Sequence, residues 1–412
     1  GVTRKYDPEN WEDYSISPSD RDEVLLTFST SGNKSSVYTS FGFINDKGYA
    51  VNSAYERLNA RIAITQDINE KLSINSTLGY TQSESNSPGQ GSSSNSQFWW
   101  LDNIPSIYPL FLRDSSGQKI PDPIYGGYLY DYGTNGRGFG FATNGVAQSY
   151  VSINRSKNNS VNFNNNIQYK ITDDLKLSHN IGYQYFMNDG ISLDEPFYSQ
   201  AAGGGGAVSR SRGETKNFTT RFTLKYDKDF GDLDLSAFAS HVANSYEFNY
   251  LYAERTNLVL PQGINISNGV VNAAPDGYTD ELTNESYILS ANLGFKEKYF
   301  FTATYNRDAT SRFINDKWGD FYGLGLAWVI SEEDYFSSDI FDFLKLKASY
   351  GQIGNSGGVG YYPGYNIYSV NNLNDKISLA FTTKGNKDLT WETSNQFNAG
   401  VEFEIGGFIT GS

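Results

Sequence analysis

The stretch Ser286-Tyr-Ile-Leu-Ser-Ala-Asn-Leu-Gly-Phe295 decides the fold of this 412-residue chain. Its odd-numbered positions read Tyr, Leu, Ala, Leu and Phe, whereas its even-numbered positions read Ser, Ile, Ser, Asn and Gly. Side chains of a β-strand point alternately to opposite faces. The alternation therefore predicts a strand with one apolar face and one mostly polar face.

The same alternation recurs along the chain, which predicts an all-β protein. A soluble antiparallel sheet with one wet face would also alternate, so this pattern does not choose between a soluble sandwich and a barrel. The clearest further examples are Leu344–Gly351, Gln396–Ile405, Leu72–Tyr80, Val161–Ile171, Leu175–Tyr185 and Phe218–Tyr226.

The lengths of the connections separate the two architectures. Short polar turns are expected at Asp67–Lys71, Thr172–Asp174, Asp227–Asp232 and Lys296–Lys298. Long connections are expected at Thr81–Ser160, Met187–Thr215, Ser245–Asn284, Asp308–Lys317 and Gln352–Trp391. Short turns at one end and long loops at the other are typical of outer-membrane barrels, and a compact soluble domain rarely has several loops above about 15 residues. We predict an antiparallel transmembrane β-barrel with long extracellular loops.

The strand count predicts an incomplete wall. About thirteen strands can be counted, whereas a bacterial single-chain barrel closes with an even number. We expect residues 1–412 to form part of a single larger barrel domain, with the closing strands outside this chain. The segment Gly1–Asn10 has no basic stretch followed by an apolar run, so either the protein is not exported or these residues are an internal portion of a longer precursor.

Composition narrows the classes of function. A net charge of −14 argues against nucleic acid as a partner, because binding phosphates requires clustered Lys and Arg. The chain has no Cys, and its two histidines, His179 and His241, lie in strand patterns and are interpreted as structural. No metal, no cofactor and no catalytic nucleophile is therefore predicted, and we expect no enzyme activity.

Several smaller motifs allow a functional and a structural interpretation. The carboxylates of Glu332–Asp334 are interpreted as a solvated turn, and Gly203–Gly206 as a flexible linker. A Ca²⁺ site at Asp114–Gly117 or Asn315–Trp318 stays an alternative without the full ligand pattern. A charge network on the lumen wall is expected to include Arg307, Asp308 and Arg312.

Longer motifs resemble one family of outer-membrane transporters. The run Tyr299-Phe-Phe-Thr-Ala-Thr-Tyr-Asn-Arg-Asp-Ala-Thr-Ser-Arg-Phe313, then Trp318–Tyr322, Ala327-Trp328 and Leu344–Asn355, is similar to the barrel of SusC/RagA proteins, a branch of the TonB-dependent transporters. Gly385–Thr393 resembles the next block of that family, and Thr30–Asn33 with Tyr38–Phe43 resembles its early hairpins. The resemblance covers nearly the whole chain. It implies a barrel of about 22 strands with the plug domain outside this chain, and it favours an internal portion of a longer precursor.

The resemblance implies active import of a bulky nutrient, an oligosaccharide or a peptide, across the bacterial outer membrane. It implies a SusD-like surface lipoprotein as partner, and contact with the TonB complex through an N-terminal part that is missing from these residues. The lipid bilayer would surround the wall. Two alternatives stay open, a non-transporting barrel that scaffolds a surface complex and an extracellular or soluble β-rich binding protein.

The first long loop contains the candidate ligand site. Aromatic side chains gather there among Pro and Gly, and flat aromatic faces bind sugars and peptides. The alternative is that the rings pack the loop onto the barrel or onto the lipoprotein. The predicted substrate-binding residues are Phe98, Trp99, Trp100, Tyr108, Tyr125 and Tyr128, accompanied by Tyr130 and Tyr132.

The alternation also predicts orientation. Leu289, Leu293, Leu346, Phe397 and Val401 are on the apolar side of their strands and are expected to face lipid. The long loop Thr81–Ser160 is expected outside the cell, and the turn Thr172–Asp174 on the periplasmic side.

Overall fold

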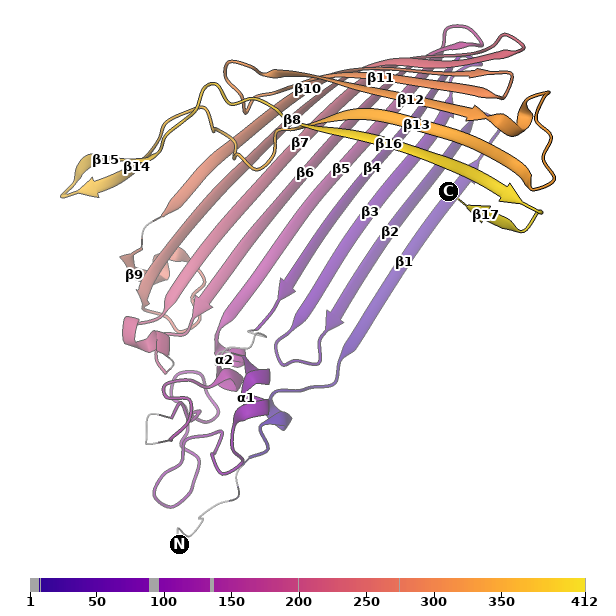
Figure 1. Cartoon of the computed structure of the whole chain (residues 1–412). Coiled ribbons are helices and arrows are strands. Elements are labelled where there is room, and N and C mark those ends of the chain that lie inside the picture. The colour runs from indigo at the N-terminus through magenta and orange to yellow at the C-terminus, as the bar shows by residue number, and fades with distance from the viewer. Residues whose placement is uncertain are drawn as a thin grey trace.

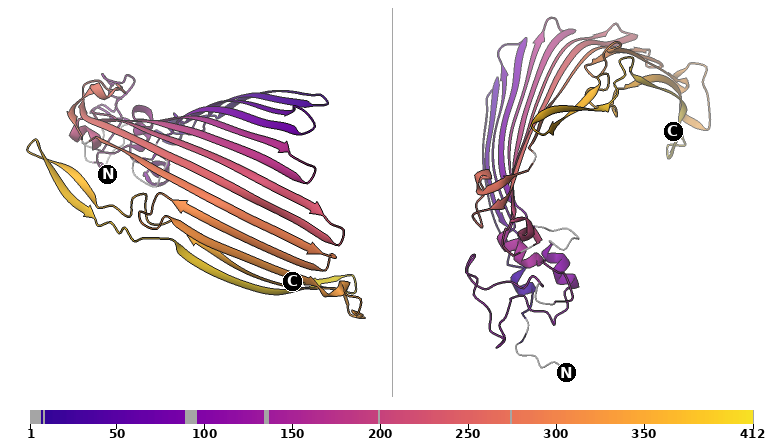
Figure 2. Two further views of the ribbon diagram at one scale, coloured as in Figure 1. Left: turned by 90° about the horizontal axis from the view of Figure 1, so that it is seen from above. Right: turned by 90° about the vertical axis from the view of Figure 1, so that its left-hand side faces the viewer.

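One large curved antiparallel sheet makes up most of the molecule (Figure 1). The computed structural model describes residues 7, 9–88, 96–133, 137–198, 200–273 and 275–411. Most of the segment Gly1–Asn10, to which the expectation about an export signal refers, therefore lies outside the described residues. In the right-hand view of Figure 2 the sheet forms an open arc with a concave side.

The long strands follow one another in the wall. They are β1 (Asp20–Ser31), β2 (Ser35–Lys47), β3 (Ala54–Asp67), β4 (Leu72–Asn86), β5 (Ile153–Lys170), β6 (Leu175–Asp194), β7 (Ala207–Asp229), β8 (Leu233–Leu258), β10 (Asp276–Phe295), β11 (Tyr299–Thr310), β12 (Trp318–Val329), β13 (Phe341–Asn355) and β16 (Glu392–Ile405). Short strands are β9 (Gly269–Asn272) and β17 (Ile409–Gly411), and a separate hairpin is formed by β14 (Ile367–Leu373) and β15 (Lys376–Thr383).

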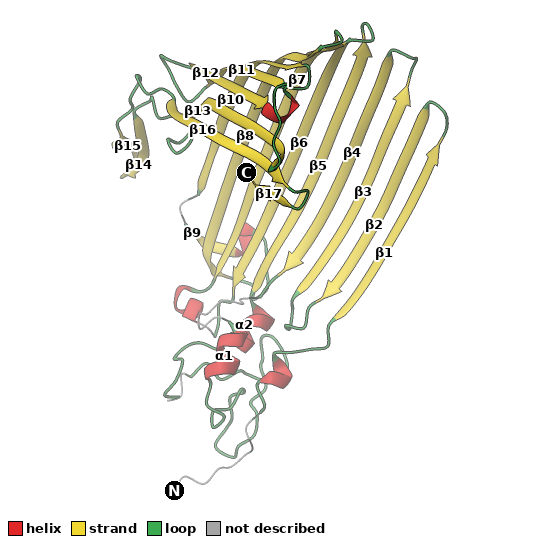
Figure 3. Cartoon of the chain, turned by 45° about the vertical axis from the view of Figure 1, so that its right-hand side comes forward, coloured by secondary structure: helices red, strands yellow, loops and turns green. Residues whose placement is uncertain are grey.

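The helices are short, and apart from the turn of helix at Ile330–Glu332 they lie near one end of the strands (Figure 3). They are α1 (Gln97–Asn103), α2 (Gly145–Val151), η1 (Glu12–Tyr14), η2 (Gln200–Gly204) and η3 (Ile266–Asn268), with η4 (Ile330–Glu332) between β12 and β13. Among the described residues, no helix has both the length and the apolar character needed to cross a membrane.

The order of strands confirms the predicted architecture. Within the described residues the main sheet has 15 strands, each long strand pairs antiparallel with the next one, and thirteen remain when the short β9 and β17 are set aside. Thirteen agrees with the sequence-based count. The two sides of the sheet end at β1 and at the β16–β17 pair.

The strands are longer than the sequence pattern predicts. Residues 187–194, 207–215 and 245–258 were expected in long loops but continue β6, β7 and β8, the last of which has 26 residues. At about 3.3 Å per residue such a strand far exceeds the hydrocarbon core of about 30 Å. Beyond the bilayer both faces meet water, so the ladder continues without apolar alternation. Cross-strand ion pairs such as Arg212–Asp189 (2.7 Å) support it there.

Register divides the wall into an apolar and a polar face. Leu289 is opposite Tyr305, and Tyr305 is opposite Tyr322 on β12. Trp328, on the same face of β12, is opposite Leu346, which is opposite Val401. All five predicted lipid-facing residues share this face, and Phe397 is 71% exposed on it.

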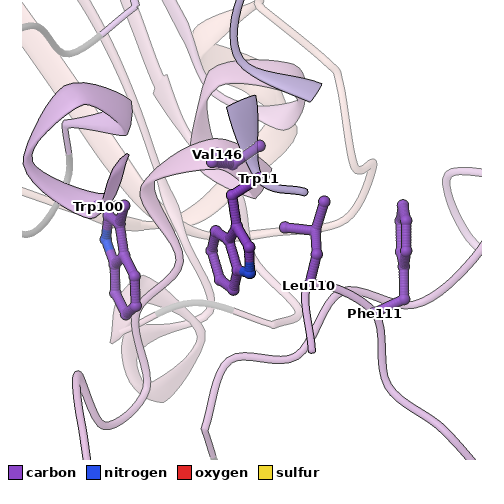
Figure 4. Packing of buried hydrophobic residues seen from close by; sticks show 5 residues of the cluster. All are labelled: Trp11, Trp100, Leu110, Phe111 and Val146. Atoms are coloured by element: carbon purple, nitrogen blue, oxygen red, sulfur yellow. The ribbon is translucent and has the colours of Figure 1, made fainter. Parts of the chain in front are cut away.

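Little of the hydrophobic core lies in the wall itself. One cluster of buried side chains, Trp11, Trp100, Leu110, Phe111 and Val146, lies beyond the ends of the strands (Figure 4). A second cluster of Leu193, Val208 and Leu258 joins the ends of β6, β7 and β8. A barrel wall is stabilised by its ladder and by lipid, whereas a long loop needs its own buried core.

Candidate functional site

The first long loop folds into a small layer at the strand ends that also carry the other long connections. We call residues 9–16, 96–133 and 137–152 the extracellular layer. Trp100 has no exposed surface there and stacks on Trp11 with ring centroids 5.5 Å apart. A Cβ at Gly145 would lie 2.4 Å from the Trp100 ring, so only glycine allows α2 to approach α1 this closely.

A buried arginine holds the other side of Trp100. The Arg137 guanidinium lies 4.7 Å from the centre of the indole and donates hydrogen bonds of 2.6–2.8 Å to backbone carbonyls. These carbonyls belong to Asp131, Phe139, Gly140 and Thr143. Because a buried cation is costly unless its donors are satisfied, this arrangement fixes the loop in one conformation.

A second aromatic group joins the first loop to the β6–β7 connection. Tyr198 donates a hydrogen bond of 2.9 Å to the buried carboxylate of Asp122, and Tyr125 donates one of 3.4 Å to the buried Glu195. Burial and the Glu195 carboxylate raise the pKa of the buried Tyr132 phenol well above its ordinary value. These tyrosines are therefore neutral hydrogen-bonding groups at physiological pH and no acid–base pair is formed.

The predicted site residues do not form one surface. Trp100 packs the loop, which favours the structural alternative for this residue, and Tyr125 joins two loops. Phe98 contacts Tyr49, with ring centroids 5.9 Å apart. Trp99 and Tyr108 are partly buried, and Tyr130 stacks on Tyr150 with centroids 6.1 Å apart. Tyr128 is 47% exposed.

The polar face of the wall forms a second candidate surface that the sequence analysis did not identify. A pocket of about 650 Å³ lies on β4–β7 and is lined mainly by neutral amides and hydroxyls, among them Asn75, Asn162, Asn164, Asn166, Asn180, Gln184, Asn217 and Thr219. Amides of neighbouring strands bond to each other, as in Asn166–Asn180 (2.5 Å) and Asn244–Asn217 (2.6 Å). This face can donate and accept hydrogen bonds without a large net charge.

The expected charge network is wrong. Arg307 and Asp308 are adjacent on β11 and therefore point to opposite faces. Arg307 lies over the Trp318 ring and 3.9 Å from Asp320, on the apolar side of the wall. Arg312 instead donates to the carbonyl of Gly360 in the long connection after β13.

The remaining small motifs have structural roles. Gly203 and Gly204 belong to η2, and the turn after them enters β7, so the flexible-linker interpretation is wrong. The Asp114 carboxylate accepts hydrogen bonds from Ser116 and Gln118 in its own turn. Within the described residues, no group of three or more His, Cys, Asp or Glu could hold a metal ion.

The histidines and the acidic turn are embedded in side-chain contacts. His179 stacks on Phe222 with centroids 3.8 Å apart, and His241 lies 2.9 Å from Glu285. Glu333 accepts a hydrogen bond of 2.9 Å from the Trp328 indole and is 3.6 Å from the Lys298 ammonium. The contacts of both histidines agree with their structural interpretation. In the acidic turn Glu332 and Asp334 are exposed, as expected of a solvated turn, whereas Glu333 is largely covered by its contacts.

An apolar face with exposed rings, a polar opposite face and long loops at one end together define the wall of an outer-membrane β-barrel. The family model described as "TonB dependent receptor-like, beta-barrel" matches residues 108–412. The chain therefore belongs to this family, whose members lie in the bacterial outer membrane.

Curated relatives agree with this assignment. The TonB-dependent receptor P39 of Formosa agariphila is 26% identical over 408 residues, covering 93% of this chain and 36% of the relative. The TonB-dependent receptor SusC of Bacteroides thetaiotaomicron is 32% identical over 146 residues, which cover 32% of this chain and 14% of SusC. These matches confirm the resemblance to SusC-type receptors. The chain spans about a third of the length of the first of these relatives.

Solved structures share the fold. The RagAB peptide transporter superposes with a TM-score of 0.74 at 22% identity, covering 97% of this chain and 44% of that chain. The outer membrane transporter YddB from Escherichia coli gives a TM-score of 0.54 at 9% identity, covering 94% of this chain and 45% of that chain. At these identities the likeness establishes the barrel architecture and nothing further.

Proposed function

We propose that this chain is the barrel portion of a TonB-dependent transporter that imports a bulky nutrient, an oligosaccharide or a peptide, across the outer membrane. The observation that carries the proposal is the neutral amide-lined wall on the inner side of a barrel of this family. Such a wall offers weak, repeated hydrogen bonds along a lumen, which suits passage better than tight retention.

Residues 1–412 form part of one barrel domain in this proposal, and the parts that complete the barrel and engage the TonB complex lie elsewhere in the whole protein. The sheet supports this, because within the described residues neither β1 nor the β16–β17 pair has a further strand beside it. Unpaired N–H and C=O groups in lipid cost several kcal/mol each, so both edges require further strands.

Deleting the full-length gene tests transport directly. We expect the deletion strain to lose growth on at least one peptide mixture or polysaccharide as sole nutrient, and complementation to restore it. Depletion of TonB should abolish the same growth. Normal growth on every nutrient, together with loss of a surface protein complex, would instead support the scaffold alternative.

We predict that antibodies reach the extracellular layer on intact cells. An epitope tag inserted between the exposed Ser115 and Ser116 should be labelled by antibody on intact cells, because it lies in the long first loop. A tag at Asp173, in the turn between β5 and β6, should be labelled only after permeabilisation. The opposite labelling would reverse the orientation.

The hairpin β14–β15 is the strongest candidate contact for a SusD-like lipoprotein. It projects away from the wall (Figure 1), and two-stranded hairpins are marginally stable alone in water. Register places Tyr368 opposite Phe381 and Val370 opposite Leu379, so one face is apolar. Ile377 shares that face and is 83% exposed. Exposed apolar rows of this kind mark interaction surfaces.

We predict that the double substitution Ile377→Asp and Leu379→Asp lowers co-purification of the lipoprotein by at least about tenfold, since it places two charges in an apolar contact. Barrel yield should be unchanged because both side chains are exposed. Ser378→Asp, on the other face of the same strand, is the matched control. Equal recovery of the lipoprotein with all variants would remove the hairpin from the interface.

The exposed aromatics of the first loop stay proposed substrate contacts. Tyr128 is 47% exposed, with its ring also contacting Lys119 and Phe111, and Phe98, Trp99 and Tyr108 retain partial exposure. In this proposal they capture the nutrient at the extracellular mouth, and Trp100 and Tyr125 act by holding the loop in shape.

A further inference from the structure

The segment Tyr246-Glu-Phe-Asn-Tyr-Leu-Tyr252 carries an aromatic residue at every second position. It was expected within a loop, but the structure makes it part of the 26-residue strand β8, toward the extracellular end. Alternate residues of a strand share one face, so the four rings form a row. The sequence analysis missed this row because polar and charged residues around it lack the apolar alternation of a lipid-facing strand.

The row faces the lumen. Asn244, the preceding residue of the same face, donates hydrogen bonds to Asn217 (2.6 Å) and Thr219 (2.9 Å). Both acceptors line the polar lumen pocket. Tyr246 is directly opposite Asn217 in the ladder between β7 and β8. The aromatic row therefore continues the amide-lined wall toward the outside.

The rings are arranged in contact with each other. Phe248 and Tyr250 are stacked with centroids 6.5 Å apart, and Tyr278 of β10 lies 5.5 Å from Tyr250. Tyr361, from the long connection after β13, stacks on Tyr246 at 6.2 Å with the ring planes 1° apart. We define the aromatic ladder as Tyr246, Phe248, Tyr250, Tyr252 and Tyr278.

The ladder is not part of a hydrophobic core. Neither cluster of buried side chains found among the described residues includes it, and all five rings keep exposed surface, 48% in Tyr278. Carboxylates flank the rings on the same face, because Asp276 is opposite Tyr252 and Asp280 is opposite Phe248. A row of open apolar faces between acidic groups suits a ligand with apolar and basic side chains.

We propose that the aromatic ladder is a binding track for an extended peptide. Side chains on one face of an extended peptide repeat every two residues, about 6.6–6.8 Å, which is the repeat of a ladder carried on a strand. Apolar side chains at alternate positions then meet successive rings, and a basic side chain on the same face of the peptide meets Asp276 or Asp280. This inference rests on the proposed transport function and names its ligand class.

The test uses the purified full-length protein and the hexapeptide Phe-Ser-Phe-Ser-Lys-Ser, whose Phe and Lys side chains share one face when the chain is extended, titrated by calorimetry. We expect Phe248→Ala combined with Tyr250→Ala to weaken binding by about tenfold or more, because two stacked contacts are lost. Leu251→Ala is the matched control, since this side chain is 61% exposed on the opposite face of the same strand. Phe248→Tyr combined with Tyr250→Phe should restore binding, which separates loss of rings from misfolding.

Several outcomes would overturn the assignment. They are an unchanged affinity in the folded Ala variant, equal losses in the Leu251→Ala control, or a wild-type protein that binds maltohexaose but not the hexapeptide. Hexalysine should bind more weakly than the mixed peptide, and equal binding would reduce the site to charge alone. Growth assays of the deletion strain report separately on transport, so a peptide-binding protein without uptake would contradict the proposed function and leave the ladder intact.

Discussion

Leu326→Arg is expected to abolish assembly of most of the protein in the outer membrane. The side chain is 60% exposed on the apolar face of β12 and lies between the rings of Tyr322 and Trp328 along that strand. Aromatic rings of this kind gather at the two membrane interfaces, so a residue between them lies near the middle of the bilayer. A charge there costs roughly 2–4 kcal/mol. Heat-modifiable barrel recovered from outer-membrane fractions measures the effect.

The opposite face of the wall supplies the control. Ser349 is opposite Gly325, next to Leu326 in the β12–β13 ladder, and points to the lumen at nearly the same depth. Ser349→Arg should therefore assemble normally. Leu346→Arg should have a smaller effect than Leu326→Arg, because Leu346 is at the level of Trp328, where a long basic side chain can reach water. Equal tolerance of Arg at 326 and 349 would refute the assignment of faces.

Trp100→Ala should unfold the extracellular layer and leave the barrel wall intact. The side chain is completely buried between Trp11 and Arg137, and replacing a buried Trp by Ala costs about 3–5 kcal/mol. A loss of about 3 kcal/mol from the free energy of opening this loop raises the population of the open loop by about a hundredfold or more. Protease added to intact cells should then cleave within residues 97–152.

Trp99→Ala is the matched control for this experiment. Trp99 is the preceding residue of α1 and stacks on Phe139 at 5.5 Å, but it keeps part of its surface exposed. We expect its substitution to increase cleavage only slightly. If Trp100→Ala left the layer as resistant as the wild type while nutrient affinity fell, the residue would act in ligand binding, as first predicted from the sequence.

The sequence by itself determined the wall. Period-two alternation in stretches such as Ser286–Phe295 was sufficient to predict strands, faces and a count near thirteen, because lipid on one side imposes a strict pattern on every second residue. The family motifs between Tyr299 and Asn355 could also be recognised in the sequence, because they lie in strands β11, β12 and β13 of the same wall. Strand register follows directly only where a short turn joins two neighbouring strands, as between β5 and β6.

Only the tertiary structure decided the details of the site. Outside the bilayer both faces of a strand meet water, so its residues need not alternate between apolar and polar. The extended ends of β6, β7 and β8 were therefore predicted as loops. The sequence of an aromatic-rich segment also does not show which of its rings are buried by other segments. Trp100 is buried by Trp11, a residue far away in the sequence, whereas Phe248 and Tyr250 contact each other and Tyr278 and keep part of their surface exposed. Burial is a property of contacts between distant segments, and local composition does not contain it.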